Sequence, residues 1–363
     1  MFGELIMNND IKKLDYIFRL IDAIYLFRNE KVNDYCKRAM MRSFFIQIDN
    51  LTKVAPRVKN SLYRNGVINA VLKRGLETQI QKLSTSYDRS YDVIRDKLGA
   101  HSQPIDFLSL YRWWNAIDYS AIEIFYGDIK EIQTMFESIH DIRFLNVSDY
   151  SPINIPSNSK LYQVEVVPSI AFDRLGFSKS SAAYMISSHP TQDKAQIILS
   201  IIDLLEVDFA VTAVTNNPST IYTKMIFDIA WMLVTIDLCS LIDNLFENTV
   251  YDISLLQYWK DNDIIGYRYL SNVGSQRKPD LESSVRNLRN TFAAHIDDSR
   301  ALEDIYSQYN ELDMISVHDY SVMLINTFRD ACRLDIRTKN FLTQNMSLGD
   351  GLEISKVINS FEN

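Results

Sequence analysis

The sequence contains little glycine and proline, with 10 glycines and 8 prolines among its 363 residues. These residue types interrupt helices and mark turns, so their scarcity argues against a turn-rich β-protein and favours long helices with short connections. Hydrophobic residues make up 47% of the chain, which is typical of a globular protein rather than a disordered one. We therefore expect an all-α fold, and the length suffices for two domains of ordinary size.

Cysteine is also rare, and Cys36, Cys239 and Cys332 are scattered with no CxxC spacing. Their odd number and wide spacing argue against a thiolate zinc site and fit a reducing compartment. Residues 1–13 contain no apolar core of a secretory signal peptide. The expected location is therefore the cytoplasm.

Apolar runs of membrane-spanning length are interrupted by acids. The two most apolar stretches, 197–214 and 225–245, each contain three aspartates or glutamates. This pattern favours buried amphipathic helices over membrane spans, so we expect no membrane partner.

The net charge of −8 disfavours a nucleic-acid ligand for the chain as a whole. The segment 37–97 differs, because it holds thirteen lysines and arginines but only five acids. Such a segment can form an electrostatic footprint for phosphates. Charge alone nevertheless favours the simpler interpretation, a solvated helix face.

Two short patterns repeat at the same distance along the chain. The tetrapeptide Ile48–Leu51 (IDNL) recurs as Ile242–Leu245, and Arg95–His101 (RDKLGAH) recurs as Arg289–His295 (RNTFAAH). Both repeats are shifted by 194 positions. A shared shift indicates an internal duplication.

A third match follows with a longer shift. Asp118–Ala121 (DYSA) resembles Asp319–Val322 (DYSV), 201 positions later. The second half has therefore gained seven residues after its motif, and 301–312 is a plausible place for them.

Apolar residues at helical spacing predict a four- or five-helix bundle in each half. The expected helices are 10–28, 33–54 (ending near Pro56), 67–98 and 105–125 in the first half, and 192–214, 222–247, 280–294 and 302–340 in the second. The connector between the halves is rich in proline and serine, and its strand-like run 161–167 is compatible with a short β-hairpin. The predicted divisions are an N-terminal bundle (1–142), a connector (143–190), a C-terminal bundle (191–340) and a tail (341–363).

The repeated motif selects two of the five histidines. Only His101 and His295 have an arginine five to seven residues before them. In each copy a polar residue, Asp96 or Asn290, directly follows the arginine, and two small residues precede the histidine. Six residues along an ideal helix rise about 9 Å and leave the two side chains on different faces, so they would meet only on a shared ligand.

These two segments resemble the Arg-x4-6-His signature of HEPN domains, all-helical modules that include many metal-independent ribonucleases of phage-defence and toxin–antitoxin systems. The resemblance implies two tandem HEPN-like bundles that form an intramolecular pseudo-dimer. It also implies one composite site lined by Arg95, His101, Arg289 and His295, with Asp96 and Asn290 in supporting roles. It implies RNA as substrate, a protein partner such as an antitoxin or defence component, and no metal or cofactor; further homo-oligomerisation stays open.

The residue types suit RNA cleavage. RNA carries its own nucleophile, the 2′-hydroxyl, beside the scissile phosphate. A histidine of near-neutral pKa can move the protons, and an arginine fork can stabilise the charge on the phosphate oxygens. The sequence has no HExxH motif and no phosphate-cradling glycine loop.

Two function classes follow. The first is a metal-independent endoribonuclease, which the presence of both motifs favours. The alternative is a non-catalytic HEPN-like module that binds RNA, nucleotide or a partner protein, which the acidic composition favours. Asp49 and Asp243 of the repeated IDNL are interpreted as a helix-packing or capping feature rather than as catalytic groups.

Overall fold

The chain is described by a computed structural model, and helices account for 82% of the described residues, with no strand among them. The all-α expectation is confirmed for this part of the chain. The structure describes residues 2–31, 34–96, 117, 119–147, 149–150, 152, 200, 204, 220–248, 253–262, 264–293, 296 and 300–325.

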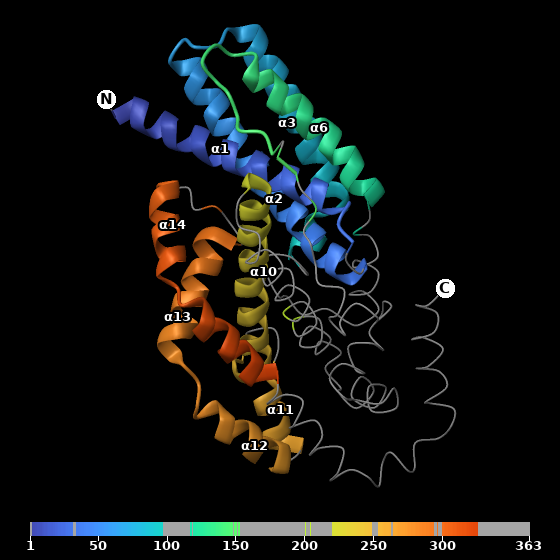
Figure 1. Ribbon diagram of the computed structural model, residues 1–363, viewed down its shortest axis with the longest axis vertical. Helices are drawn as coiled ribbons and strands as arrows, with labels where there is room; N and C mark the ends of the chain where they lie inside the picture. The colour runs from blue at the N-terminus through green and yellow to red at the C-terminus, as the bar shows by residue number, and fades with distance from the viewer. Residues whose placement is uncertain are drawn as a thin grey trace.

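The first half contributes five described helices, which Figure 1 shows in blue to green. They are α1 (Phe2–Phe27), α2 (Asp34–Arg64), α3 (Ala70–Ser90), α4 (Asp92–Ile94) and α6 (Tyr119–Glu137). Helix α2 packs against both α1 and α3, and α3 packs against α6. The faces between them are filled by apolar side chains, as expected of a helix bundle.

Helix α2 passes through Pro56 and ends at Arg64, so the predicted end near Pro56 was wrong. A proline inside a helix removes one backbone hydrogen bond and costs about 3 kcal/mol. Val58 and Leu62, which follow Pro56 on the buried face, are each only 1% exposed. Their burial offsets the cost of the proline and extends the helix.

The second half supplies the elements that Figure 1 shows in yellow to red. They are α10 (Ile221–Phe246), α11 (Leu255–Asn262), α12 (Ile264–Gly274), α13 (Pro279–Leu288), the π-helix η4 (Arg289–Ala293), α14 (Leu302–Glu311) and a helix over Met314–Ile325.

Two differences from the predicted helices stand out in this half. Helices α11 and α12 were not predicted, although Leu255, Trp259 and Leu270 anchor them in the core at 2% exposure or less. The predicted single helix 302–340 is interrupted at Leu312, and a new helix begins where Asp313 accepts hydrogen bonds from the Ile315 backbone and the Ser316 hydroxyl. An aspartate in this position caps the start of a helix.

Several predictions fall on residues that the structure does not describe. They concern residues 105–116, the strand-like run 161–167 of the connector, nearly all of 192–214, and the tail 341–363. The three predicted boundaries between the four segments therefore stay predictions.

Helix α10 is the central element of the described fold, and Figure 1 shows it between the first-half helices and α13–α14. It is the one described helix long and apolar enough to cross a membrane, yet 94% of its most apolar window is buried inside the protein. The burial predicted for 225–245 is confirmed. The predicted amphipathic character was wrong, because buried residues occur around the whole helix.

A buried ion pair joins α10 to α2 of the first half. The Arg42 guanidinium donates to both carboxylate oxygens of Asp237, at 3.3 and 2.7 Å. The two side chains are 0% and 4% exposed. Such a pair contributes little net stability but penalises any arrangement in which either charge is buried alone.

We expect Arg42→Met to lower the free energy of unfolding by about 3–5 kcal/mol, because it leaves the Asp237 carboxylate buried without a cation. The double variant Arg42→Met/Asp237→Leu should recover much of that loss. Urea denaturation measures both. Lys12→Met, which breaks an ion pair with Glu303 at 49% and 61% exposure, serves as the control and should change stability by less than about 1 kcal/mol. An equal loss in Arg42→Met and Lys12→Met would contradict the assigned role.

A second buried carboxylate connects three helices. Asp228 of α10 accepts hydrogen bonds from the hydroxyls of Tyr16 in α1 and Tyr306 in α14, at 3.0 and 2.9 Å. The Tyr16 ring stacks on Phe292 of η4 with centroids 5.9 Å apart. Burial raises the pKa of Asp228 to about 6, although both tyrosine hydrogen bonds oppose the shift. Arg19 and Lys224 act in the same direction as the tyrosines.

This raised pKa predicts a specific pH dependence of stability. Because protonated Asp228 is favoured in the folded state, its contribution is fully present below pH 3.8 and is lost as pH rises through about 6. Between pH 4 and 7.5 the wild type should therefore lose about 2 kcal/mol relative to Asp228→Asn. Urea denaturation of both proteins across this range measures the difference. Glu311→Gln, at an exposed position of α14, should follow the wild type; parallel curves for wild type and Asp228→Asn would refute the prediction.

Candidate functional site

The arginines of both motifs begin a π-helical turn. Arg95 and Asp96 follow α4 in π-helical geometry, and η4 begins at Arg289 directly after α13. π-Helical turns are rare and occur frequently at functional sites. The duplicated motif is therefore accompanied by a duplicated departure from ideal helix geometry.

In the first copy, Arg95 is held by two carboxylates. Its Nη1 lies 2.9 Å from Asp49 Oδ1 on α2, and its Nη2 lies 2.6 Å from Asp96 Oδ1. The other oxygen of Asp49 lies 2.6 Å from Lys53 Nζ. Burial alone would lower the pKa of the Arg95 guanidinium, but Asp49 and Asp96 outweigh it and raise that pKa above its ordinary value. Arg95 is thus a firmly charged, carboxylate-bound residue.

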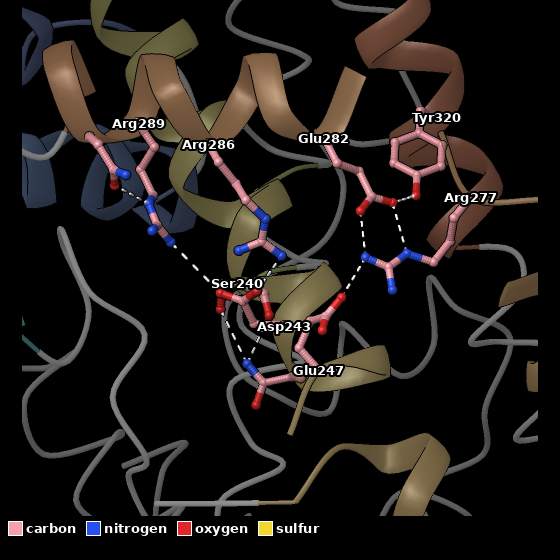
Figure 2. A network of polar contacts seen from close by, with 10 residues as sticks. Ser240, Asp243, Glu247, Arg277, Glu282, Arg286, Arg289 and Tyr320 are labelled. Carbon is pink, nitrogen blue, oxygen red and sulfur yellow. Dashed lines mark hydrogen bonds and ion pairs between the residues drawn. The ribbon is translucent and has the colours of Figure 1, made fainter. Parts of the chain in front are cut away.

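In the second copy, Figure 2 shows Arg286 and Arg289 directed from one helical segment toward Asp243 of α10. Arg286 Nη2 lies 2.5 Å from Asp243 Oδ1, whereas Arg289 Nη1 lies 3.7 Å from Asp243 Oδ2. Arg289 Nε donates to Asn290 Oδ1 at 3.1 Å. In both copies, therefore, the motif arginine contacts the residue that follows it and an aspartate of a neighbouring helix, Asp49 of α2 or Asp243 of α10.

A second part of this network surrounds Arg277, as Figure 2 shows. Arg277 Nη2 lies 2.6 Å from Glu247 and 2.5 Å from Glu282. Glu282 also accepts a hydrogen bond from the Tyr320 hydroxyl. Glu282 thus forms its hydrogen bonds with Arg277 and Tyr320, and among the described residues it makes none with Arg286 or Arg289.

The two aspartates of the repeated IDNL are the partners of the two motif arginines. Interpreting them as packing or capping residues missed this role. The sequence did contain a sign of this pairing, because the two aspartates are separated by the same 194 positions as the two arginines. Arg286 was also missed, because the position that matches it in the first half is Asp92.

A hydrogen bond joins the second motif to the first half. The backbone N–H of Ile296, the residue that follows His295 in the sequence, donates to Asn50 Oδ1 at 3.2 Å. Asn50 is 2% exposed and adjoins Asp49, the partner of Arg95. The structure thus brings the residue that follows the second motif to the same turn of α2 that holds the first motif's arginine. His101 and His295 themselves lie outside the described residues.

Much of the positive charge in 37–97 is already paired with carboxylates. The pairs are Lys53–Asp49, Arg57–Asp10, Lys59–Glu77 and Lys82–Asp128, at 2.6, 3.7, 3.3 and 2.8 Å. These pairs reduce the potential that the segment presents to phosphates and favour its interpretation as a helix face.

No family model, no curated protein and no solved structure matches this sequence.

We expect Asn50→Ala to lower the free energy of unfolding by about 1–3 kcal/mol, because the buried Ile296 N–H loses its acceptor. Hydrogen exchange of the Ile296 amide should accelerate with it. Asn50→Asp keeps an acceptor oxygen and should exchange more slowly than Asn50→Ala. The matched control is Asn244→Ala at the repeated position, where the amide donates only within α10, to Ser240. An Ile296 amide that exchanges equally fast in wild type and Asn50→Ala would contradict the assignment.

Proposed function

We propose that this chain is a tandem HEPN-like, metal-independent endoribonuclease whose two motifs form one composite site between its halves. The observation that carries the proposal is the Ile296–Asn50 hydrogen bond beside the Asp49–Arg95 ion pair. It supports a single site because residues 246 positions apart are in contact: the residue that follows the second motif bonds to Asn50, whose neighbour Asp49 binds the arginine of the first motif.

The proposed reaction uses the nucleophile that RNA itself carries. One motif histidine accepts the proton of the 2′-hydroxyl as its oxygen attacks phosphorus, and the other protonates the departing 5′-oxygen. The products are a 2′,3′-cyclic phosphate and a free 5′-hydroxyl. Arginine at the site stabilises the charge that grows on the non-bridging oxygens. His101 and His295 are the proposed acid–base pair.

The biological setting proposed with this chemistry is cytoplasmic defence against phage or a toxin–antitoxin pair, with a protein partner that restrains the nuclease. The motif resemblance carries this part of the proposal. A restraining partner suits the chemistry, because an unrestrained ribonuclease would damage the RNA of its own cell.

A second candidate is a non-catalytic module that binds RNA, nucleotide or a partner protein. One observation favours it: both terminal nitrogens of Arg95 already lie on carboxylates, at 2.9 and 2.6 Å. An arginine occupied in this way has less to offer a phosphate than a free one.

The proposal is tested by incubating purified protein with single-stranded RNA in EDTA and analysing the ends of the fragments. The wild type should cleave and leave cyclic-phosphate or 3′-phosphate ends. His101→Ala and His295→Ala should each reduce the rate by about 10²–10⁴-fold, because each removes a proton-transfer group. His318→Ala, at an exposed histidine outside the motifs, should cleave like the wild type. Unchanged cleavage in the His101→Ala/His295→Ala protein would rule out the mechanism, and RNA binding without any cleavage would support the second candidate.

A further inference from the structure

We infer that the two motif copies are not equivalent: Arg289 of the second copy binds the scissile phosphate, whereas Arg95 of the first copy is a positioning residue locked into the protein by ion pairs. This inference rests on the proposed function, because it assigns the phosphate of that reaction to one arginine. It is carried by differences between the copies at matching positions.

The first difference is the number of guanidinium nitrogens of each arginine that other groups of the protein already engage. Arg95 Nη1 donates a hydrogen bond to Asp49, Nη2 forms an ion pair with Asp96 at 2.6 Å, and Nε is buried without a hydrogen-bond partner among the described residues. Arg289 donates a hydrogen bond through Nε, to Asn290. Its Nη1 lies 3.7 Å from Asp243, beyond hydrogen-bond distance, and within the described chain no hydrogen bond engages either terminal nitrogen. The two arginines are almost equally exposed, 18% for Arg95 and 19% for Arg289, so they differ in the partners of their terminal nitrogens, which in Arg289 stay available to a bidentate phosphate.

The second difference is the distance from each motif arginine to its aspartate. Arg95 Nη1 lies 2.9 Å from Asp49 Oδ1, whereas Arg289 Nη1 lies 3.7 Å from Asp243 Oδ2. Each aspartate also binds a second cation through its other oxygen, Lys53 at 2.6 Å in the first copy and Arg286 at 2.5 Å in the second. Asp49 thus binds both of its cations closely, whereas Asp243 binds Arg286 closely and Arg289 only loosely.

The third difference is the residue after each arginine. Asp96 places a negative charge 2.6 Å from Arg95. This charge compensates that of the guanidinium and repels a phosphate. Asn290 stands at the matching position, and its side-chain oxygen accepts a hydrogen bond from the Nε of Arg289. A neutral amide leaves the charge of Arg289 intact and adds N–H donors on an exposed surface. The second copy is thus suited to an anion, and the first is not.

Reciprocal exchange of this residue gives the test. The probe is a fluorescent, mixed-sequence single-stranded oligonucleotide with 2′-O-methyl riboses throughout, which lacks the nucleophile and cannot be cleaved by the proposed reaction. Anisotropy titrations with the full-length chain give its Kd. Asn290→Asp should weaken binding about tenfold, because a charge-assisted contact is neutralised. Asn287→Asp is the matched control, since it places the same charge on the exposed surface one turn earlier, in α13, and should weaken binding much less.

The arginines are compared in the same assay. Arg289→Gln should weaken binding about tenfold more than Arg95→Gln does. Because Arg95→Gln removes the ion pairs of Arg95 with Asp49 and Asp96 and can unfold the chain, Asp96→Asn supplies a second measurement, and it should not weaken binding. Circular dichroism confirms the fold of each variant.

The outcomes separate the two proposals. Equal weakening by Arg95→Gln and Arg289→Gln, or by Asn290→Asp and Asn287→Asp, overturns the inequivalence of the copies even if His101 and His295 prove essential for cleavage. Loss of binding confined to Arg289→Gln and Asn290→Asp supports it. If that pattern appears in a protein that cleaves no RNA, the anion site stands and the nuclease proposal fails.

Discussion

The described fold depends on how α10 crosses α2. Helix α10 is buried around its whole circumference, so it is stable only when helices of both halves cover it. At the crossing, Arg42 and Asp237 are buried together and penalise any other register of the two helices. Two helical turns beyond Arg42, the same helix α2 presents Asp49 and Asn50 to the site. The geometry of the candidate site is therefore set by the packing of the core.

The duplicated motif shows how one arrangement can diverge within a chain. Both halves keep an arginine at the start of a π-helical turn and an aspartate on the helix that faces it. What surrounds the pair differs, because Arg286 replaces an acid of the first half and Asn290 replaces Asp96. The ion pair is tight in the first copy and loose in the second. Identical key residues thus acquire different electrostatic surroundings through their neighbours.

Periodicity predicted most of the described helices, since apolar residues at helical spacing must share a buried face. It failed where local signals and tertiary packing conflicted. Pro56 signals a helix end, yet buried side chains beyond it sustain α2. Helices α11 and α12 have only 8 and 11 residues, too few for an isolated helix to be stable, and they form in a context where α11 packs against both α10 and α12. The break before Asp313 depends on a capping aspartate inside a stretch that otherwise has helical spacing.

The sequence by itself determined the all-α character, the two short patterns repeated at one shift and the choice of Arg95 and Arg289, because composition, spacing and a shared shift are properties of the chain alone. Only the tertiary structure decided what those arginines contact. Asp49 and Arg95 are 46 positions apart, and Asn50 and Ile296 are 246 apart. Such partners meet only when helices pack, and packing depends on the buried surfaces of the whole chain rather than on any local pattern. The two Arg-x5-His motifs are therefore alike in sequence and different in the electrostatic environment of their arginines.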